Sequence, residues 1–265
     1  MTAPATSLDD VLTAISRRVS YLRAEPTRPT DDAWIDCEVL ATDAGARALA
    51  AAIDAGTAGR GGGDRQVGAS LFAQSYAFKT SAIALAAYAI GLPAPSPSAG
   101  ALAVRLAKGR AAGLALRTHD TTAPGDPGTP ARLAEALLAQ HLAPFLGAVR
   151  REVRIGERLL WGNVAASCAA AFRAVEGAAR DRGDDIERAH VRARAATFFA
   201  AAEPWLGSAG RFELVEHAGS EGWFWTRTSC CLWFRTSGGP TCDDCSLIAA
   251  DDLLTQRHAE LKRAS

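Results

Sequence analysis

Hydrophobic positions recur at helical spacing along most of the chain. In the first segment, apolar residues on one face follow Ser7, and Asp10 three residues later gives a capping-box-like start. The same spacing predicts further helices over residues 43–56, 74–90, 133–149, 163–182, 185–205 and 247–262. Pro144 lies inside one of these runs, so we expect a kink or a break there, because proline lacks the backbone N–H that a helix interior uses.

Two parts of the chain depart from this helical period. Within residues 101–118, apolar residues alternate with small or charged ones on both sides of a Lys-Gly-Arg turn at residues 108–110, which predicts a β-hairpin. The aromatic content of residues 212–215 and 222–234 indicates extended structure as well. The predicted fold class is therefore mainly α within the α+β class: a helical body, a small antiparallel β element and a C-terminal loop with four cysteines.

Segments rich in proline and glycine divide the chain. They occupy residues 56–63, 92–100 and 120–130 and are typical of loops. From the distribution of the elements we expect two regions, a helical body over residues 1–210 and a C-terminal region over residues 211–265 that carries the cysteines.

Composition and charge narrow the class of protein. The chain has 265 residues, 48% of them apolar and 22% charged, which is ordinary for a globular protein. With 29 basic and 29 acidic residues the formal net charge is zero, which predicts no nucleic-acid partner. The most apolar stretch, residues 81–94, is shorter than the roughly twenty residues of a membrane-spanning helix. The first residues lack the pattern of a signal peptide, so we expect a cytoplasmic protein without stable membrane insertion.

Four of the six cysteines lie close together near the C-terminus. They form a vicinal pair, ten intervening residues and a C-x-x-C: Cys230, Cys231, Cys242 and Cys245. Thiolates gathered in this way repel one another unless a soft cation neutralises them. The Gly-Gly-Pro at residues 238–240 allows the chain to reverse, so that the two halves meet. The pattern predicts one metal site.

The residues alone leave two metals open. An iron–sulfur cluster is favoured over structural zinc, because zinc sites usually separate paired cysteines by two to four residues. Two disulfides are disfavoured in the cytoplasm, where thiols stay reduced. No G-x-G-x-x-G follows a predicted strand, so no nicotinamide or flavin site is indicated and electrons must come from a partner.

The cysteine segment resembles the C-terminal motif of the FhuF-like ferric-siderophore reductase family. It reads S-C-C-L-x-x-R, then Gly-Gly, then C-x-x-C, although Ser246 stands where family members often carry proline. Leu-Trp-Gly-Asn at residues 160–163 is similar to the family's middle region. The resemblance implies a 2Fe–2S cluster, bound by the four cysteines Cys230, Cys231, Cys242 and Cys245.

The resemblance also implies a reaction. One electron passes from the cluster to Fe(III) in an imported siderophore, of the hydroxamate type by preference, and Fe(II) is released, since hard oxygen ligands hold Fe(II) poorly. An external donor such as a ferredoxin or a flavoprotein supplies the electron, and residues 1–210 would face the siderophore. Two other functions stay open: a zinc-stapled binding module without redox activity, and a redox-sensing interaction protein that uses the cluster as a switch.

Several side chains near the cysteines are candidates for supporting roles. Arg227 and Arg235 flank the vicinal pair and either donate to sulfur or form surface ion pairs. Trp233 is a candidate to screen the cluster from solvent, although packing is the favoured interpretation for it and for Trp223 and Trp225.

Other polar residues have simpler interpretations. We expect Asn163 to cap a helix and Cys37 and Cys168 to be buried in the core.

Overall fold

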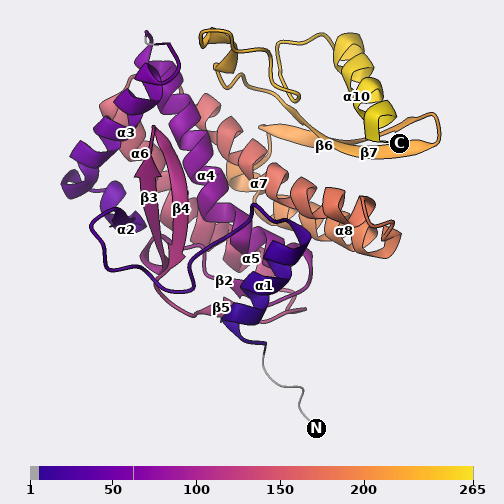
Figure 1. Cartoon of the computed structure of the whole chain (residues 1–265), viewed down its shortest axis with the longest axis horizontal. Coiled ribbons are helices and arrows are strands. Elements are labelled where there is room, and N and C mark those ends of the chain that lie inside the picture. Colours follow the sequence, from indigo (N-terminus) through magenta and orange to yellow (C-terminus); the bar gives the residue numbers. More distant parts are fainter. Residues whose placement is uncertain (1–5, 62, 265) are drawn as a thin grey trace.

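The computed structural model describes residues 6–61 and 63–264. Its helices are α1 (Leu8–Arg18), α2 (Cys37–Leu40), α3 (Ala46–Ala58), α4 (Arg65–Ala89), α5 (Thr129–Ala134), α6 (Ala143–Glu152), α7 (Glu157–Arg180), α8 (Asp185–Ala201), α9 (Glu203–Leu206) and α10 (Ala250–Ala264). Its strands are β1 (Trp34–Asp36), β2 (Ala94–Pro95), β3 (Leu102–Ala107), β4 (Arg110–Leu116), β5 (Thr121–Thr122), β6 (Gly210–His217) and β7 (Ser220–Arg227). The prediction of a mainly helical protein with small antiparallel sheets is confirmed (Figure 1).

The first helix begins as its sequence predicts. The Asp10 backbone N–H donates to Ser7 Oγ at 3.1 Å, and the Ser7 N–H donates to Asp10 Oδ2 at 3.1 Å. This reciprocal capping box satisfies two donors that the first turn leaves without an intrahelical partner. The apolar face then buries Val11 and Ile15 against the core.

The centre of the body is the pair α4 and α7, which run past each other in the middle of Figure 1. Small residues bring the two helices close together: Ala69, Ala73, Ala77, Ala165 and Ala169 are fully buried. Helix α4 begins at Arg65, well before the predicted residue 74, because Asp64 caps it by accepting from Gln66 N at 2.8 Å. Its first turns are buried nearly all round, so they lack the polar face from which an amphipathic period is recognised.

The predicted hairpin is confirmed as β3 and β4. Lys108 and Gly109 form its two-residue turn with φ of 50° and 68°, the signs that a type I′ turn requires. A Cβ on Gly109 would lie 2.2 Å from Gly56 Cα, so the tip of the hairpin touches the last turn of α3. Strand β1, which the sequence did not indicate, pairs with the other edge of β3.

The predicted break near Pro144 takes the form of a π-helical segment, Glu135–Leu142, between α5 and α6. Pro144 has no N–H for the carbonyl four residues earlier, which favours a shift of the hydrogen-bond register in the preceding turn. The segment carries the buried His141, whose Nδ1 lies 2.7 Å from Pro97 O and whose Nε2 lies 2.8 Å from the Tyr76 hydroxyl. Burial lowers the pKa of His141 to about 4, so the ring is neutral, with Nδ1 donating and Nε2 accepting.

The C-terminal region lies along one side of the body, against α7 (Figure 1). Strands β6 and β7 form a hairpin on which Phe212 stacks against Trp223 with ring centroids 3.9 Å apart. Packing is thus the role of Trp223 and of Trp225, both buried. The extended structure expected over residues 222–234 ends at Arg227, where the chain enters an irregular loop.

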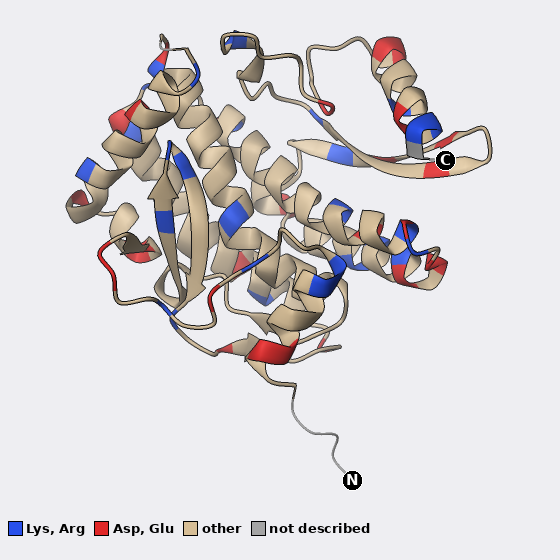
Figure 2. Cartoon of the chain, in the orientation of Figure 1, with Lys and Arg blue, Asp and Glu red and all other residues tan. Residues whose placement is uncertain are grey.

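Charged positions are mixed along the surface. Figure 2 shows basic and acidic residues interspersed on α8 and α10, in keeping with the balanced composition. The β3–β4 hairpin is an exception, because it carries Arg and Lys but no acidic residue. None of the described helices combines the length and the apolar character needed to cross a bilayer.

Candidate metal centre

The four cysteines of the predicted site lie on one loop, residues 228–249, between β7 and α10. Cys231 and Cys245 are buried, each with 2% of its surface exposed, and Cys230 and Cys242 are half-buried. The Sγ atoms of Cys231 and Cys242 lie 2.9 Å apart, as free thiols. The loop therefore folds back and brings the vicinal pair against the C-x-x-C, as the glycines between them predict.

Backbone geometry explains how each half presents its sulfurs. Leu232 adopts a left-handed conformation, with φ of 66°, and its N–H donates to Cys230 Sγ at 3.3 Å. A β-branched or bulky residue rarely takes this conformation without a constraint from its surroundings. In the second half, the Cys245 N–H donates to Cys242 O at 3.1 Å, which closes the C-x-x-C into a turn.

Arg227, at the end of β7, is the cation of the site. Its side chain has 0% exposure, and Nε lies 3.2 Å from Asp244 Oδ2. Nevertheless Nε, Nη1 and Nη2 have no hydrogen-bond partner among the described residues, so the contact with Asp244 is an ion pair without hydrogen-bond geometry. Buried donors in this state are rare and indicate acceptors that the protein itself does not provide. Sulfur atoms of a cluster beside the four thiolates are acceptors of that kind.

The electrostatics of the thiols agree with this arrangement. A hydrogen bond from the Cys242 thiol lowers the pKa of Cys231 to about 6, and the Arg227 guanidinium acts in the same direction. The pKa of Cys242 is raised, because its thiol is the donor of that bond. Burial raises the pKa of Cys230, and the charges of Cys231 and Cys245 add to this effect. Cys231 thus lies within electrostatic reach of Cys230 and Cys242, and Cys230 lies within reach of Cys245.

Two buried polar residues of the body fasten the loop in place. Ser70 Oγ, in α4, donates to Cys231 O at 2.7 Å. Asn163 Nδ2, in α7, donates to Ser70 O at 3.0 Å and to Ser70 Oγ at 2.9 Å. The expectation that Asn163 caps a helix is wrong: α7 begins after Gly156, and Asn163 is buried in its interior. Ser70 gave no signal in the sequence, because its partner is more than 160 positions away.

A close approach of the Ser229 side chain to the α7 backbone adds to this contact. A Cβ on Gly162, in α7, would lie 1.8 Å from Ser229 Oγ. The Gly-Asn pair at residues 162–163 therefore provides both the room and the hydrogen bonds that seat the cysteine loop on the body.

The remaining candidates have distinct positions. Arg235 is exposed and pairs with Asp64, the cap of α4, at 3.2 Å, so it ties the loop to the body at the surface. Trp233 is half-buried and faces a cavity beside the loop. Cys37 and Cys168 are buried, and burial raises the pKa of each to about 12, so their expected place in the core is confirmed.

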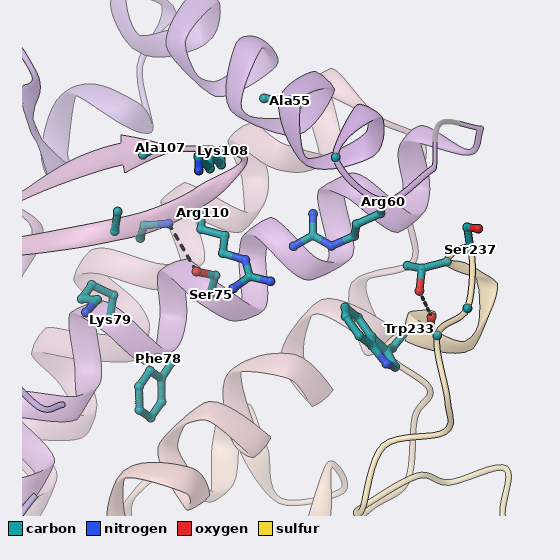
Figure 3. Close-up of a pocket in the computed structure, with 16 residues that line it drawn as sticks. Ala55, Arg60, Ser75, Phe78, Lys79, Ala107, Lys108, Arg110, Trp233 and Ser237 are labelled. Carbon is teal, nitrogen blue, oxygen red and sulfur yellow. Dashed lines mark hydrogen bonds between the residues drawn. The ribbon is translucent and has the colours of Figure 1, made fainter.

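The cavity that Trp233 lines has a volume of about 890 Å³. Figure 3 shows its walls: the end of α3, one side of α4, the tip of the β3–β4 hairpin and the cysteine loop. A space of this size is in the range that accommodates a small-molecule ligand.

The donor set fits a two-iron cluster. Four thiols on one loop, with Cys231 and Cys242 in contact and a buried guanidinium that lacks acceptors, match the thiolates and sulfur-directed hydrogen bonds of a 2Fe–2S centre.

Comparison with known proteins agrees with this chemistry. Residues 70–205 match the model of the ferric iron reductase FhuF-like transporter family, and residues 227–247 match the FhuF 2Fe–2S C-terminal domain. No curated protein matches the chain. The second match indicates a 2Fe–2S cluster as the cofactor, and the first covers half of the chain. The chain thus belongs to the FhuF-like ferric iron reductase family.

Proposed function

We propose that this protein is a cytoplasmic ferric-siderophore reductase whose 2Fe–2S cluster is held by Cys230, Cys231, Cys242 and Cys245. The observation that carries the proposal is the contact between the two halves of the motif, Cys231 Sγ to Cys242 Sγ at 2.9 Å, beside the unpartnered guanidinium of Arg227. The match to a ferric iron reductase family supports the type of reaction. The cytoplasm is the compartment in which thiolates stay reduced and available for iron.

When bound, the cluster supplies electrons one at a time, which suits the reduction of Fe(III) to Fe(II). The ferric chelate accepts one electron and no bond to the protein is formed. Oxygen ligands such as hydroxamates bind Fe(II) much more weakly than Fe(III), so the metal then dissociates from the siderophore. An external donor, a ferredoxin or a flavoprotein, replaces the electron.

The protein's own residues have three tasks in this proposal. The four cysteines bind the irons, and Arg227 donates toward sulfur and offsets negative charge. Ser70 donates to the Cys231 carbonyl, and Asn163 donates to Ser70 and keeps it in place, so that the loop keeps its position on the body. We assign residues 211–265 to cluster binding and residues 1–210 to the siderophore-facing body, a division supported by the start of β6 at Gly210.

The test combines spectroscopy, metal analysis and turnover on anaerobically purified protein. We expect a red-brown protein with about two irons and two acid-labile sulfides per chain. A chemical reductant should bleach the absorption, and a ferric trihydroxamate should restore it while Fe(II) accumulates on a ferrous chelator. A colourless protein with one zinc, or a cluster that ferric chelates do not reoxidise even after reconstitution, would contradict the proposal.

A further inference from the structure

The cavity beside the cysteine loop is lined by four basic side chains: Arg60, Lys79, Lys108 and Arg110. They come from three places, the turn after α3, the middle of α4 and the β3–β4 hairpin. In Figure 3 the guanidinium groups of Arg60 and Arg110 extend toward one another into the same space. Among the residues that the structure describes, no acidic one lines the cavity.

None of these four cations forms an ion pair with any carboxylate in residues 6–61 or 63–264. A second group of neighbouring arginines shows the contrast, because carboxylates neutralise it. On α8, Arg188 and Arg192 both pair with the buried Glu176 and with Glu221. The charges in the cavity are therefore left without an internal partner.

Two of these charges, Arg60 and Lys79, are partly buried and therefore poorly solvated. Burial lowers the pKa of Arg60, and the nearby charge of Arg110 lowers it further. Burial likewise lowers the pKa of Lys79. The Arg60 Nη1 donates to Gly56 O at 2.7 Å, but its buried Nε has no partner in the described part of the chain. Like charges that repel one another in a half-buried site are stabilised by an anion.

The opposite wall of the cavity is part of the cysteine loop. Trp233 and the turn at residues 236–239 form it, and Trp233 follows the ligand Cys231 by two positions. The Ser237 N–H donates to Arg60 O at 3.2 Å, so the loop and the cationic wall are directly joined. With Phe78, Trp233 adds aromatic surface against which an organic ligand can pack. A ligand in the cavity thus lies beside the proposed cluster.

We propose that this cavity is the substrate site and that it selects ferric chelates with a net negative charge. The inference rests on the proposed reductase function and names the substrate class. Three hydroxamate groups, each with one negative charge, neutralise Fe(III). A plain trihydroxamate chelate is therefore uncharged and has no net charge with which to attract the four cations. A trihydroxamate chelate that also carries a free carboxylate keeps a net negative charge and pairs with Arg60 and Arg110.

The test uses gallium(III), which has the charge of Fe(III) but is not reduced under these conditions, so that binding is measured apart from electron transfer. The probes are gallium complexes of one linear trihydroxamate whose terminal amine is free, acetylated or succinylated, with net charges of +1, 0 and −1. Calorimetry on the cluster-loaded protein at low salt should rank the succinylated complex tightest, about tenfold above the acetylated one. Equal affinities, or the reverse order, would overturn the proposal.

Variants locate the effect in the cavity. Arg60→Gln and, separately, Arg110→Gln should each remove most of the preference for the succinylated complex. Arg110 is exposed, and its side chain makes no hydrogen bond or ion pair with another described residue, so its replacement preserves folding even if that of Arg60 does not. Arg47→Gln is the matched control, because Arg47 is an exposed arginine on α3 that does not line the cavity, and the preference should persist.

The outcomes separate this inference from the proposed function. If ferric trihydroxamates are reduced but the gallium complexes bind without regard to charge, the reductase stands and the anionic site is wrong. If the gallium complexes bind in the expected order but no ferric complex is reduced, the anionic site stands and the reductase is wrong.

Discussion

The helical body and the cysteine loop are held together by different forces. In the body, α4 and α7 pack through fully buried alanines and large aromatic side chains, and burial of each large apolar side chain contributes about 1.5–3 kcal/mol. The loop over residues 228–249 has one short 3₁₀ turn, Trp233–Arg235, and leaves side chains such as Phe234 and Leu247 exposed. It has too little apolar burial to fix its own conformation.

What fixes the loop is a small set of polar contacts and, when loaded, the metal. Ser70, itself held by Asn163, donates to the Cys231 carbonyl. Arg227 pairs with Asp244, and Arg235 pairs with Asp64. We therefore expect the body to fold without the cluster, whereas the conformation of the loop should depend on it.

Replacement of one cysteine ligand should have the largest effect on cluster content and should change the structure of the loop alone. We expect Cys231→Ser to abolish nearly all bound iron and sulfide, because four thiolates are needed to hold two irons. The far-ultraviolet circular dichroism and the thermal midpoint of the helical body should change little. Cys168→Ala is the control: it alters the buried core of α7 and should lower stability while leaving the iron content unchanged. Loss of helical signal in Cys231→Ser would show that the body does not fold independently of the cluster.

Glycine substitutions in α7 should separate the contact with the loop from the helix itself. A Cβ on Gly162 would clash with Ser229 Oγ, so Gly162→Ala should displace the loop and speed loss of the cluster to a chelator by about tenfold, equivalent to about 1.4 kcal/mol. Gly177→Ala in the same helix meets no atom within 4 Å and should raise stability by about 0.5–1 kcal/mol through helix propensity. Equal rates of cluster loss in the two variants would show that α7 does not seat the loop.

The same asymmetry governs what the sequence predicts. Local signals were sufficient for the capping box of α1, the turn of the β3–β4 hairpin and the spacing of the cysteines, because each depends on a few adjacent residues. The first turns of α4 and the short strand β1 were missed, since one lacks a polar face and the other has three residues that only their pairing with β3 orders.

Contacts between distant parts of the chain could not be predicted from the sequence. Asn163 was assigned to a helix cap because it stands at the expected start of a helix, where asparagine is favoured, yet its partner is Ser70. The cationic cavity combines residues of α3, α4 and the β3–β4 hairpin with Trp233, and no spacing in the sequence links these elements. The cofactor motif was therefore predictable, whereas the seat of the loop and the neighbouring cavity required the fold.

A buried histidine offers a test confined to the body. His141 has its pKa lowered from 6.5 to about 4, so the unfolded chain binds a proton between these values that the folded protein does not. The stability contribution is complete above pH 6.5 and is lost as the pH falls toward 4, by about 3 kcal/mol. Chemical unfolding at pH 7, 5.5 and 4.5 should show this slope in the wild type and a weaker slope in His141→Gln. The rate of cluster release at pH 7 should be the same in both proteins.

The smallest expected effect concerns Arg227 and tests whether this residue acts directly on the cluster. Its buried positive charge favours the state with one more electron, so Arg227→Gln should lower the midpoint potential of the cluster by roughly 30–60 mV, where 59 mV corresponds to about 1.4 kcal/mol for one electron. Arg227→Lys should have a midpoint potential close to that of the wild type, because lysine keeps the positive charge although it lacks the planar set of donors. Arg235→Gln removes an exposed arginine that pairs with Asp64 and should leave the potential unchanged within a few mV. A potential that responds equally to Arg227→Gln and Arg235→Gln would mean that Arg227 acts as one surface charge among others. The donors of Arg227 would then be buried because of the packing of β7 and not because they face the cluster. The loop would in that case be held in place mainly by its contacts with the body.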